Sequence, residues 1–133
     1  MRNTTDRFSF MLKPSTIAEG GVGVFLLHDV AEGTYMEVFL KDFEEEVVSS
    51  NDVPEALQGY CLDQEDGKLL CPKFFNRMDI GNYLNHSDNA NLRWEEGKGY
   101  FSKRDIKAGE ELFADYRELG EPKDGWDDYI QKV

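Results

Sequence analysis

The apolar residues of this chain occur in short runs separated by turns that contain glycine, asparagine, aspartate or serine. The runs are rich in β-branched and aromatic residues, which favour strands, and glycine permits the tight turns between them. The predicted strands span residues 8–13, 22–27, 35–40, 60–63, 68–72, 92–95, 100–103 and 111–116. Because little of the sequence shows helical periodicity, this pattern indicates a mainly β fold, or α+β at most.

Two short helical segments are expected between these strands. One ends at Gln58, where the Ser/Asn/Asp cluster ahead of Pro54 could supply its cap. The other is a helical turn within residues 73–80. The acidic run at 42–46 is interpreted as a solvated face, as most charge runs are.

The length and composition indicate one globular domain. The chain has 133 residues, of which 40% are hydrophobic and 32% charged, so disorder is not expected. No apolar run approaches the ~20 residues of a membrane span, and no basic, apolar leader opens the sequence. We therefore expect no membrane partner, no secretion, and a cytoplasmic or nuclear location.

The charge of the chain is strongly acidic, with a formal net value of −12. Nucleic-acid binding requires a basic face, so the charge argues against that class of partner. The acidity suits a basic protein partner, whose encounter it would accelerate. The alternative is that the charge only keeps a small protein soluble.

The most unusual stretch is the polar segment 81–91, which is rich in asparagine and contains Asn85-His86-Ser87. Such residues favour turns, so an ordinary polar loop is the simplest interpretation. However, Tyr83 and Leu84 are apolar and should direct the chain inward just before Asn85. A second unusual stretch follows at residues 108–116.

Together these stretches resemble the SET-domain family of protein-lysine methyltransferases, and the compact viral or bacterial members in particular. The matching residues are Asn85-His86-Ser87, Asn91, Gly109-Glu110-Glu111-Leu112 and Asp115-Tyr116. The resemblance covers about residues 8–129. It implies a β-clip of several small twisted sheets, with the last strand threaded beneath the loop around Asn85 and His86 in a C-terminal pseudoknot. It also implies a single SET domain over 1–133, with a core at about 8–117 and a closing segment at about 118–133.

The reaction implied by the resemblance is methyl transfer from S-adenosylmethionine to a lysine amine, leaving S-adenosylhomocysteine. The cofactor already activates the methyl group, so the protein needs neither a nucleophile nor a metal. It must align amine and methyl at ~3 Å, exclude water and receive a neutral amine, whose pKa is ~10.4 in water. The sequence contains no plausible Ser/His/Asp set and no phosphate-binding loop, which agrees with this chemistry.

The resemblance also assigns roles to individual residues. Tyr116 is the candidate catalytic residue, and Tyr60 is either a second tyrosine of the lysine channel or a core residue. The candidate cofactor-binding residues are Gly21, Val22, Gly23, Tyr83, Asn85, His86, Tyr116 and Trp126. The glycine segment would offer main-chain groups, Asn85 would bind the amino-acid end, and His86 would hold the adenine through its backbone while its ring braces the pseudoknot. Trp126 would cover the adenine or, alternatively, belong to a surface helix with a buried face.

We expect no metal. Many relatives carry cysteine where this chain has Asp88, and their cysteine-rich tail binds zinc, whereas the tail here has no cysteine. Cys61 and Cys71 cannot form a structural zinc site without further ligands. They are interpreted as ordinary thiols, although a disulfide between them is compatible with their spacing. Asn82 replaces an arginine that is frequent in relatives.

Three functions remain open at this point. The first is a lysine methyltransferase, similar to those acting on histones, whose partner is a lysine-containing basic protein or peptide. The others are an inactive module that binds basic peptides on the same fold, and methyl transfer to another acceptor such as histidine. A virus-encoded protein would act inside the host cell. A homodimer is compatible with the sequence, but no feature demands one.

Overall fold

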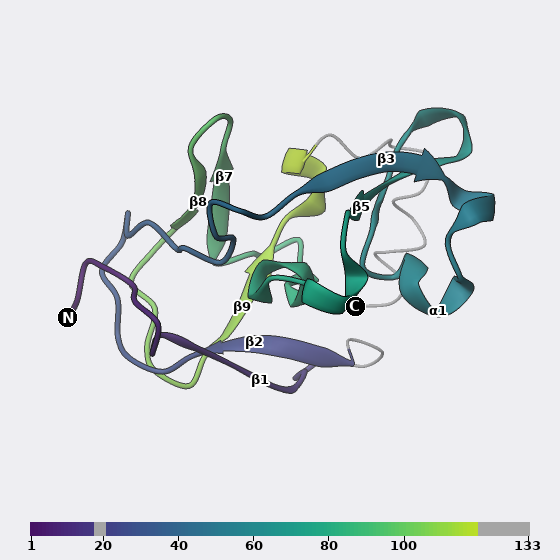
Figure 1. The fold of residues 1–133 in the computed structure, drawn as a ribbon. Helices are drawn as coiled ribbons and strands as arrows, with labels where there is room; N and C mark the ends of the chain where they lie inside the picture. The colour runs from purple at the N-terminus through teal and green to yellow at the C-terminus, as the bar shows by residue number, and fades with distance from the viewer. Residues whose placement is uncertain (18–20, 120–133) are drawn as a thin grey trace.

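The computed structural model describes residues 1–17 and 21–119, which form three small sheets joined by turns and short helices (Figure 1). The strands are β1 (Phe10–Pro14), β2 (Val22–Leu26), β3 (Glu45–Ser49), β4 (Leu62–Asp63), β5 (Lys68–Pro72), β6 (Asn85–His86), β7 (Leu92–Glu95), β8 (Gly99–Ser102) and β9 (Glu111–Ala114). The α-helix is α1 (Glu55–Gln58), and the 3-10 helices are η1 (Ser50–Asp52), η2 (Glu65–Gly67), η3 (Phe75–Arg77), η4 (Ile80–Tyr83) and η5 (Tyr116–Leu119). The mainly β fold class is therefore confirmed.

The four-stranded sheet has the order β1-β2-β9-β6 and positions the candidate site. β2 is antiparallel to both β1 and β9, whereas β6 runs parallel to β9. In this parallel pair Asn85 lies opposite Phe113, and His86 lies opposite Ala114. The two unusual stretches of the sequence are thus neighbours in one sheet.

The main core lies against this sheet and against the β7-β8 hairpin. Val24, Leu26, Ile106 and Leu112 are fully buried there, and Leu92 joins them from β7. Each large aliphatic side chain buried in this way contributes about 1.5–3 kcal/mol relative to an exposed one. The core therefore holds β2 and β9 rigidly together beside the candidate site.

A smaller core supports the three-stranded sheet, whose order is β3-β5-β4. It contains Val53, Cys61, Leu69 and Cys71, all of them buried. This sheet and α1 lie to one side of the four-stranded sheet (Figure 1). The three-stranded sheet therefore has a core of its own, separate from the main core.

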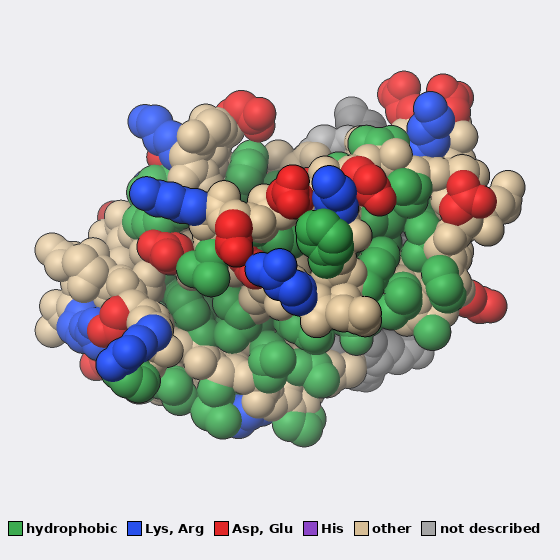
Figure 2. Space-filling view, viewed as in Figure 1, with side chains coloured by type: hydrophobic (Ala, Val, Ile, Leu, Met, Phe, Trp, Pro, Cys, Tyr) green, Lys and Arg blue, Asp and Glu red, His purple; other side chains and the backbone are tan. Residues whose placement is uncertain are grey.

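The edge strand β1 carries exposed hydrophobic side chains, Met11 and Leu12, and hydrophobic surface is visible over β1 and β2 in Figure 2. Charged side chains of both signs cover the region around β3 in the same view. Within the described ranges, no helix is both long and apolar enough to cross a membrane.

Residues 35–40, predicted to be a strand, do not form one. Tyr35 makes only an isolated bridge to Phe101, and no strand continues alongside it. Met36 and Val38 are nevertheless buried in the main core. The alternating pattern in the sequence therefore reflects burial of every second side chain rather than strand pairing.

A strand that the sequence did not predict begins inside the acidic run and continues beyond it. β3 begins at Glu45 and pairs antiparallel with β5 along its whole length, with its glutamates exposed and Val48 packed on the smaller core.

The predicted helix cap lies one element earlier than expected. Ser49 accepts a hydrogen bond from the N–H of Asn51 and so caps η1, whereas Pro54 precedes α1 without a side-chain bond.

Candidate active site

A cavity of about 260 Å³ lies where the start of β2, α1 and η4 come together. Its lining residues are Gly21, Val22, Ala56, Gly59, Tyr60, Asn82, Tyr83, Leu84, Asn85 and Tyr116. Most of the predicted cofactor and catalytic residues are therefore brought to one cavity by four separate segments of the chain.

A second, narrower cavity of about 60 Å³ shares part of this wall. Its residues are Phe39, Glu45, Gly59, Tyr60, Cys61, Leu62, Gly81, Asn82, Leu84, Tyr100, Tyr116 and Leu119. Tyr60 and Tyr116 line both cavities, and the Tyr60 ring lies edge-on to Tyr83 with centroids 5.5 Å apart. Aromatic walls of this kind attract cations.

Tyr116 is held from two sides. Its hydroxyl donates a hydrogen bond to the carbonyl of Leu84, and its backbone N–H donates to Nδ1 of His86 at 3.0 Å. The rings of Tyr116 and His86 also contact each other, with centroids 5.3 Å apart. The Tyr116 side chain is thereby fixed at the wall between the two cavities.

The ring of His86 is buried and acts as a brace. Because Nδ1 accepts from Tyr116, Nε2 carries the proton and donates to Asp88, 3.1 Å away. Asp88 also lies 3.3 Å from Arg117. Arg117 in turn binds Asp115, and these hydrogen bonds hold the pKa of Asp115 below its usual value.

The side-chain amide of Asn85 has a defined orientation. Its Nδ2 donates to the carbonyl of Val22 at 3.1 Å and to Oε2 of Glu111 at 3.2 Å. Both partners can only accept, so the nitrogen must face them. The carbonyl oxygen Oδ1 is therefore the group that Asn85 can offer to a ligand.

Glu111 was named above only as part of the Gly-Glu-Glu-Leu motif, and sequence reasoning assigned it no role in this site. Its side chain is buried at the start of β9 and accepts hydrogen bonds from Ser15, Thr16 and Asn85. Burial by itself would raise the pKa of Glu111, but these hydrogen bonds outweigh it and the pKa lies below its usual value. The signal that could have found it is a glutamate at an inward-facing position of a predicted strand.

Gly23 does not line the cavity, although it was predicted to bind the cofactor. A Cβ at this position would lie 2.2 Å from Oε2 of Glu111, so the missing side chain makes room for that carboxylate. Gly21 and Val22, in contrast, line the cavity.

A sequence model of the SET domain matches residues 21–117 of this chain. The chain belongs to the SET-domain family. No curated protein matches it in a search of such proteins. Among 188 matching chains of solved structures is a Plasmodium falciparum protein described as a candidate histone methyltransferase. It shares the fold with a TM-score of 0.53 and 19% identity, over 84% of this chain and 95% of that one.

Two of the predictions concern residues that the structure does not describe. Trp126 lies outside the described residues, as does most of the predicted closing segment at 118–133.

Within residues 1–17 and 21–119, no group of three or more His, Cys, Asp or Glu side chains is arranged to hold a metal ion. Cys61 and Cys71 are buried thiols whose sulfurs lie 2.8 Å apart, and burial raises the pKa of both.

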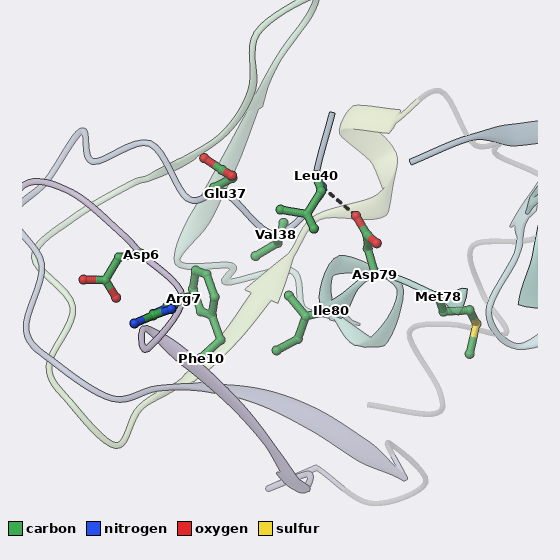
Figure 3. Close-up of a pocket in the computed structure, with 9 residues that line it drawn as sticks. All are labelled: Asp6, Arg7, Phe10, Glu37, Val38, Leu40, Met78, Asp79 and Ile80. Atoms are coloured by element: carbon green, nitrogen blue, oxygen red, sulfur yellow. Dashed lines mark hydrogen bonds between the residues drawn. The ribbon is translucent and has the colours of Figure 1, made fainter. Parts of the chain in front are cut away.

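A larger cavity of about 430 Å³ lies elsewhere on the SET domain, beside the N-terminal segment. Figure 3 shows the residues that line it, which are Asp6, Arg7, Phe10, Glu37, Val38, Leu40, Met78, Asp79 and Ile80. Asp79 accepts a hydrogen bond from the N–H of Leu40 across one wall. None of the predicted site residues that the structure describes lines this cavity.

Proposed function

We propose that this SET domain transfers a methyl group from S-adenosylmethionine to the side-chain amine of a lysine in a protein substrate. The observation that carries the proposal is that Tyr60 and Tyr116 line both the cavity of about 260 Å³, the wider of the two, and the narrower one of about 60 Å³. The wider cavity would hold the cofactor, and the narrower one would admit the lysine side chain. The two reacting groups would then meet at these tyrosines.

The chemistry of the wider cavity fits the amino-acid end of the cofactor. Asn85 offers Oδ1 as an acceptor, which suits an ammonium group, and the main chain at Gly21 and Val22 adds further polar atoms. Tyr83 provides an aromatic wall. When bound, S-adenosylmethionine supplies an activated methyl group, so these residues need only bind and orient it.

The narrower cavity fits a lysine side chain. Phe39, Tyr60, Tyr100 and Tyr116 supply aromatic surface, and Glu45 supplies a carboxylate. Such a set attracts a cationic side chain, and burial among aromatic rings then favours the neutral amine that must react. The net charge of −12 supports a basic protein or peptide as the substrate.

Tyr116 would position the amine. Its O–H donates to the carbonyl of Leu84, so its oxygen acts as an acceptor toward the N–H of the substrate amine. A hydrogen bond of this kind would aim the nitrogen lone pair at the methyl group without any proton transfer to Tyr116. We also propose that the parallel pairing of β6 with β9 belongs to the pseudoknot of the family.

A transfer assay tests the proposal. The wild-type protein is incubated with S-adenosylmethionine labelled in the methyl group and with three peptide libraries that share basic flanks and differ only in a central lysine, histidine or alanine. Label in the lysine library alone is the expected result. Label in the histidine library alone would contradict lysine as the acceptor. Peptide binding without cofactor binding would instead support an inactive module that binds basic peptides.

A further inference from the structure

We infer that Glu111 is a positioning residue, whose buried carboxylate fixes the amide of Asn85 and anchors residues 15–16 beside the cofactor cavity. The inference rests on the proposed function in one respect only, namely that the cavity binds S-adenosylmethionine. Glu111 itself does not line the cavity, so it would act through Asn85 and through the segment that presents Gly21 and Val22.

Among residues 1–17 and 21–119, every hydrogen-bond partner of this carboxylate is a donor. Oε1 accepts from the N–H and the hydroxyl of Thr16, at 2.7 and 2.6 Å. Oε2 accepts from the hydroxyl of Ser15 at 2.7 Å and from Nδ2 of Asn85 at 3.2 Å. An ionised carboxylate satisfies this set, because it accepts at both oxygens and donates at neither.

The same set explains why glutamine cannot replace glutamate here. Its amide would place an NH2 group against the donors of either Thr16 or Ser15 and Asn85. In the second case Asn85 could accept from this NH2 group only by turning its own amide over. That rotation would break the bond from Nδ2 to Val22 and present a donor, rather than Oδ1, to the cavity.

Glu111 also connects the segments that form the cavity wall. Ser15 donates its backbone N–H to the carbonyl of Gly21 at 2.8 Å, so residue 15 is bonded both to Glu111 and to the start of the cavity wall. The absence of a Cβ at Gly23 leaves the space that the carboxylate occupies. The neighbouring Glu110 instead binds Arg104, 2.9 Å away and partly exposed. Glu110 therefore provides a matched control with the same side chain in the same motif.

The test is calorimetric titration of wild type, Glu111→Gln, Glu110→Gln, Asn85→Ala and the double variant Glu111→Gln/Asn85→Ala. Each is titrated with S-adenosylhomocysteine and with 5′-methylthioadenosine, which lacks the amino-acid end. We expect Glu111→Gln to weaken S-adenosylhomocysteine at least tenfold and 5′-methylthioadenosine less than twofold, and Glu110→Gln to weaken neither. The double variant should bind S-adenosylhomocysteine no more weakly than Asn85→Ala alone, because both changes remove one contact.

Three outcomes would overturn the inference. They are wild-type affinity in Glu111→Gln, an equal loss for both ligands, and losses that add in the double variant. An equal loss would mean that Glu111 only maintains the fold.

A measurement on the unliganded protein separates this inference from the proposed function. By NMR, we expect the amide proton of Thr16 to exchange at least tenfold faster in Glu111→Gln than in wild type or Glu110→Gln. If Glu111→Gln does not fold, the side-chain amide protons of Asn85 in wild type should still exchange at least tenfold more slowly than those of the exposed Asn89. Equal exchange in either comparison would overturn the inference. Absence of S-adenosylhomocysteine binding by wild type, with these NMR results intact, would overturn only the proposed function.

Discussion

The backbone N–H of Tyr116 donates a 3.0 Å hydrogen bond to Nδ1 of His86, 30 residues earlier in the chain. This bond joins the start of η5, which follows β9, to the end of β6, and it places the Tyr116 side chain at the wall shared by the two cavities. The histidine of the Asn-His-Ser motif therefore contributes its ring to the position of the tyrosine rather than to the cavity itself.

Replacing Tyr116 with phenylalanine should remove transfer and preserve binding. The variant loses the oxygen that would orient the amine, so we expect the rate of methyl transfer to fall on the order of 10²-fold. The hydrogen bond to Leu84 is lost as well, at about 0.5–1.5 kcal/mol of stability. A transfer assay measures the fall in rate, and calorimetry checks that binding is preserved. Tyr35→Phe, at an exposed ring beside Phe101, is the control, and full activity of Tyr116→Phe would contradict the assigned role.

Replacing His86 with phenylalanine should destabilise the protein. The substitution leaves the N–H of Tyr116 without its acceptor in a partly buried place, which costs about 1–3 kcal/mol. Asp88→Asn keeps an acceptor oxygen for Nε2 and should cost less than half as much. Urea unfolding at neutral pH measures both variants. Equal stability of His86→Phe and wild type would show that the ring is not a brace.

Acid should weaken the contribution of Glu111 to stability. The pKa of this carboxyl in the folded protein lies below the ~4.3 of an unfolded glutamate, because the donors around it outweigh the effect of burial. Its stabilising effect is therefore fully present above about pH 4.3 and is lost as the pH falls through the folded value. Wild type should exceed Glu111→Gln in unfolding free energy at pH 7 by about 1.5–3 kcal/mol, and the difference should shrink below pH 4. A difference that stays constant down to pH 2 would contradict this linkage.

Replacing Gly23 with alanine should displace the Glu111 carboxylate, which lies beside the candidate active site. The new Cβ would meet Oε2 of Glu111 at 2.2 Å, so the carboxylate must move, and overpacking of this kind costs about 1–3 kcal/mol. Gly59→Ala is the matched control, because its φ of −64° suits alanine and nothing lies within 4 Å of the added carbon. Thermal unfolding of the two variants gives the comparison. A Gly23→Ala melting temperature equal to that of Gly59→Ala would show that the space is not needed.

Much of the fold could be predicted from local sequence. The hairpin of β7 and β8 and the pairing of β4 with β5 follow from apolar runs with turns between them, because both are contacts between neighbours in sequence. The prediction of a strand at residues 35–40 was wrong because burial and strand pairing leave the same alternating pattern in the sequence. β3 was missed because its glutamates are exposed, and only the distant partner β5 makes that run a strand.

The site could be predicted only as far as its motifs extend. Only the resemblance to a family assigned Asn85, Tyr83 and Tyr116 to one site, because spacing alone says nothing of the pairing of β6 with β9. The structure brings the three residues to one cavity. The role of Glu111 depends on Ser15 and Thr16, which lie 95 or 96 residues away and carry no recognisable pattern. A contact of that kind becomes visible only when the chain is folded.

The most direct test of the proposed function is the thermal stability of the wild-type protein with and without S-adenosylmethionine, with Asn85→Ala as the control. At about 100 times its dissociation constant, a ligand that binds only the folded state adds about 2.7 kcal/mol. In a domain of this size that should raise the melting temperature by several degrees. We predict a shift of this size in wild type and a much smaller one in Asn85→Ala. No shift in wild type at millimolar S-adenosylmethionine would contradict the assignment of the cavity to this cofactor.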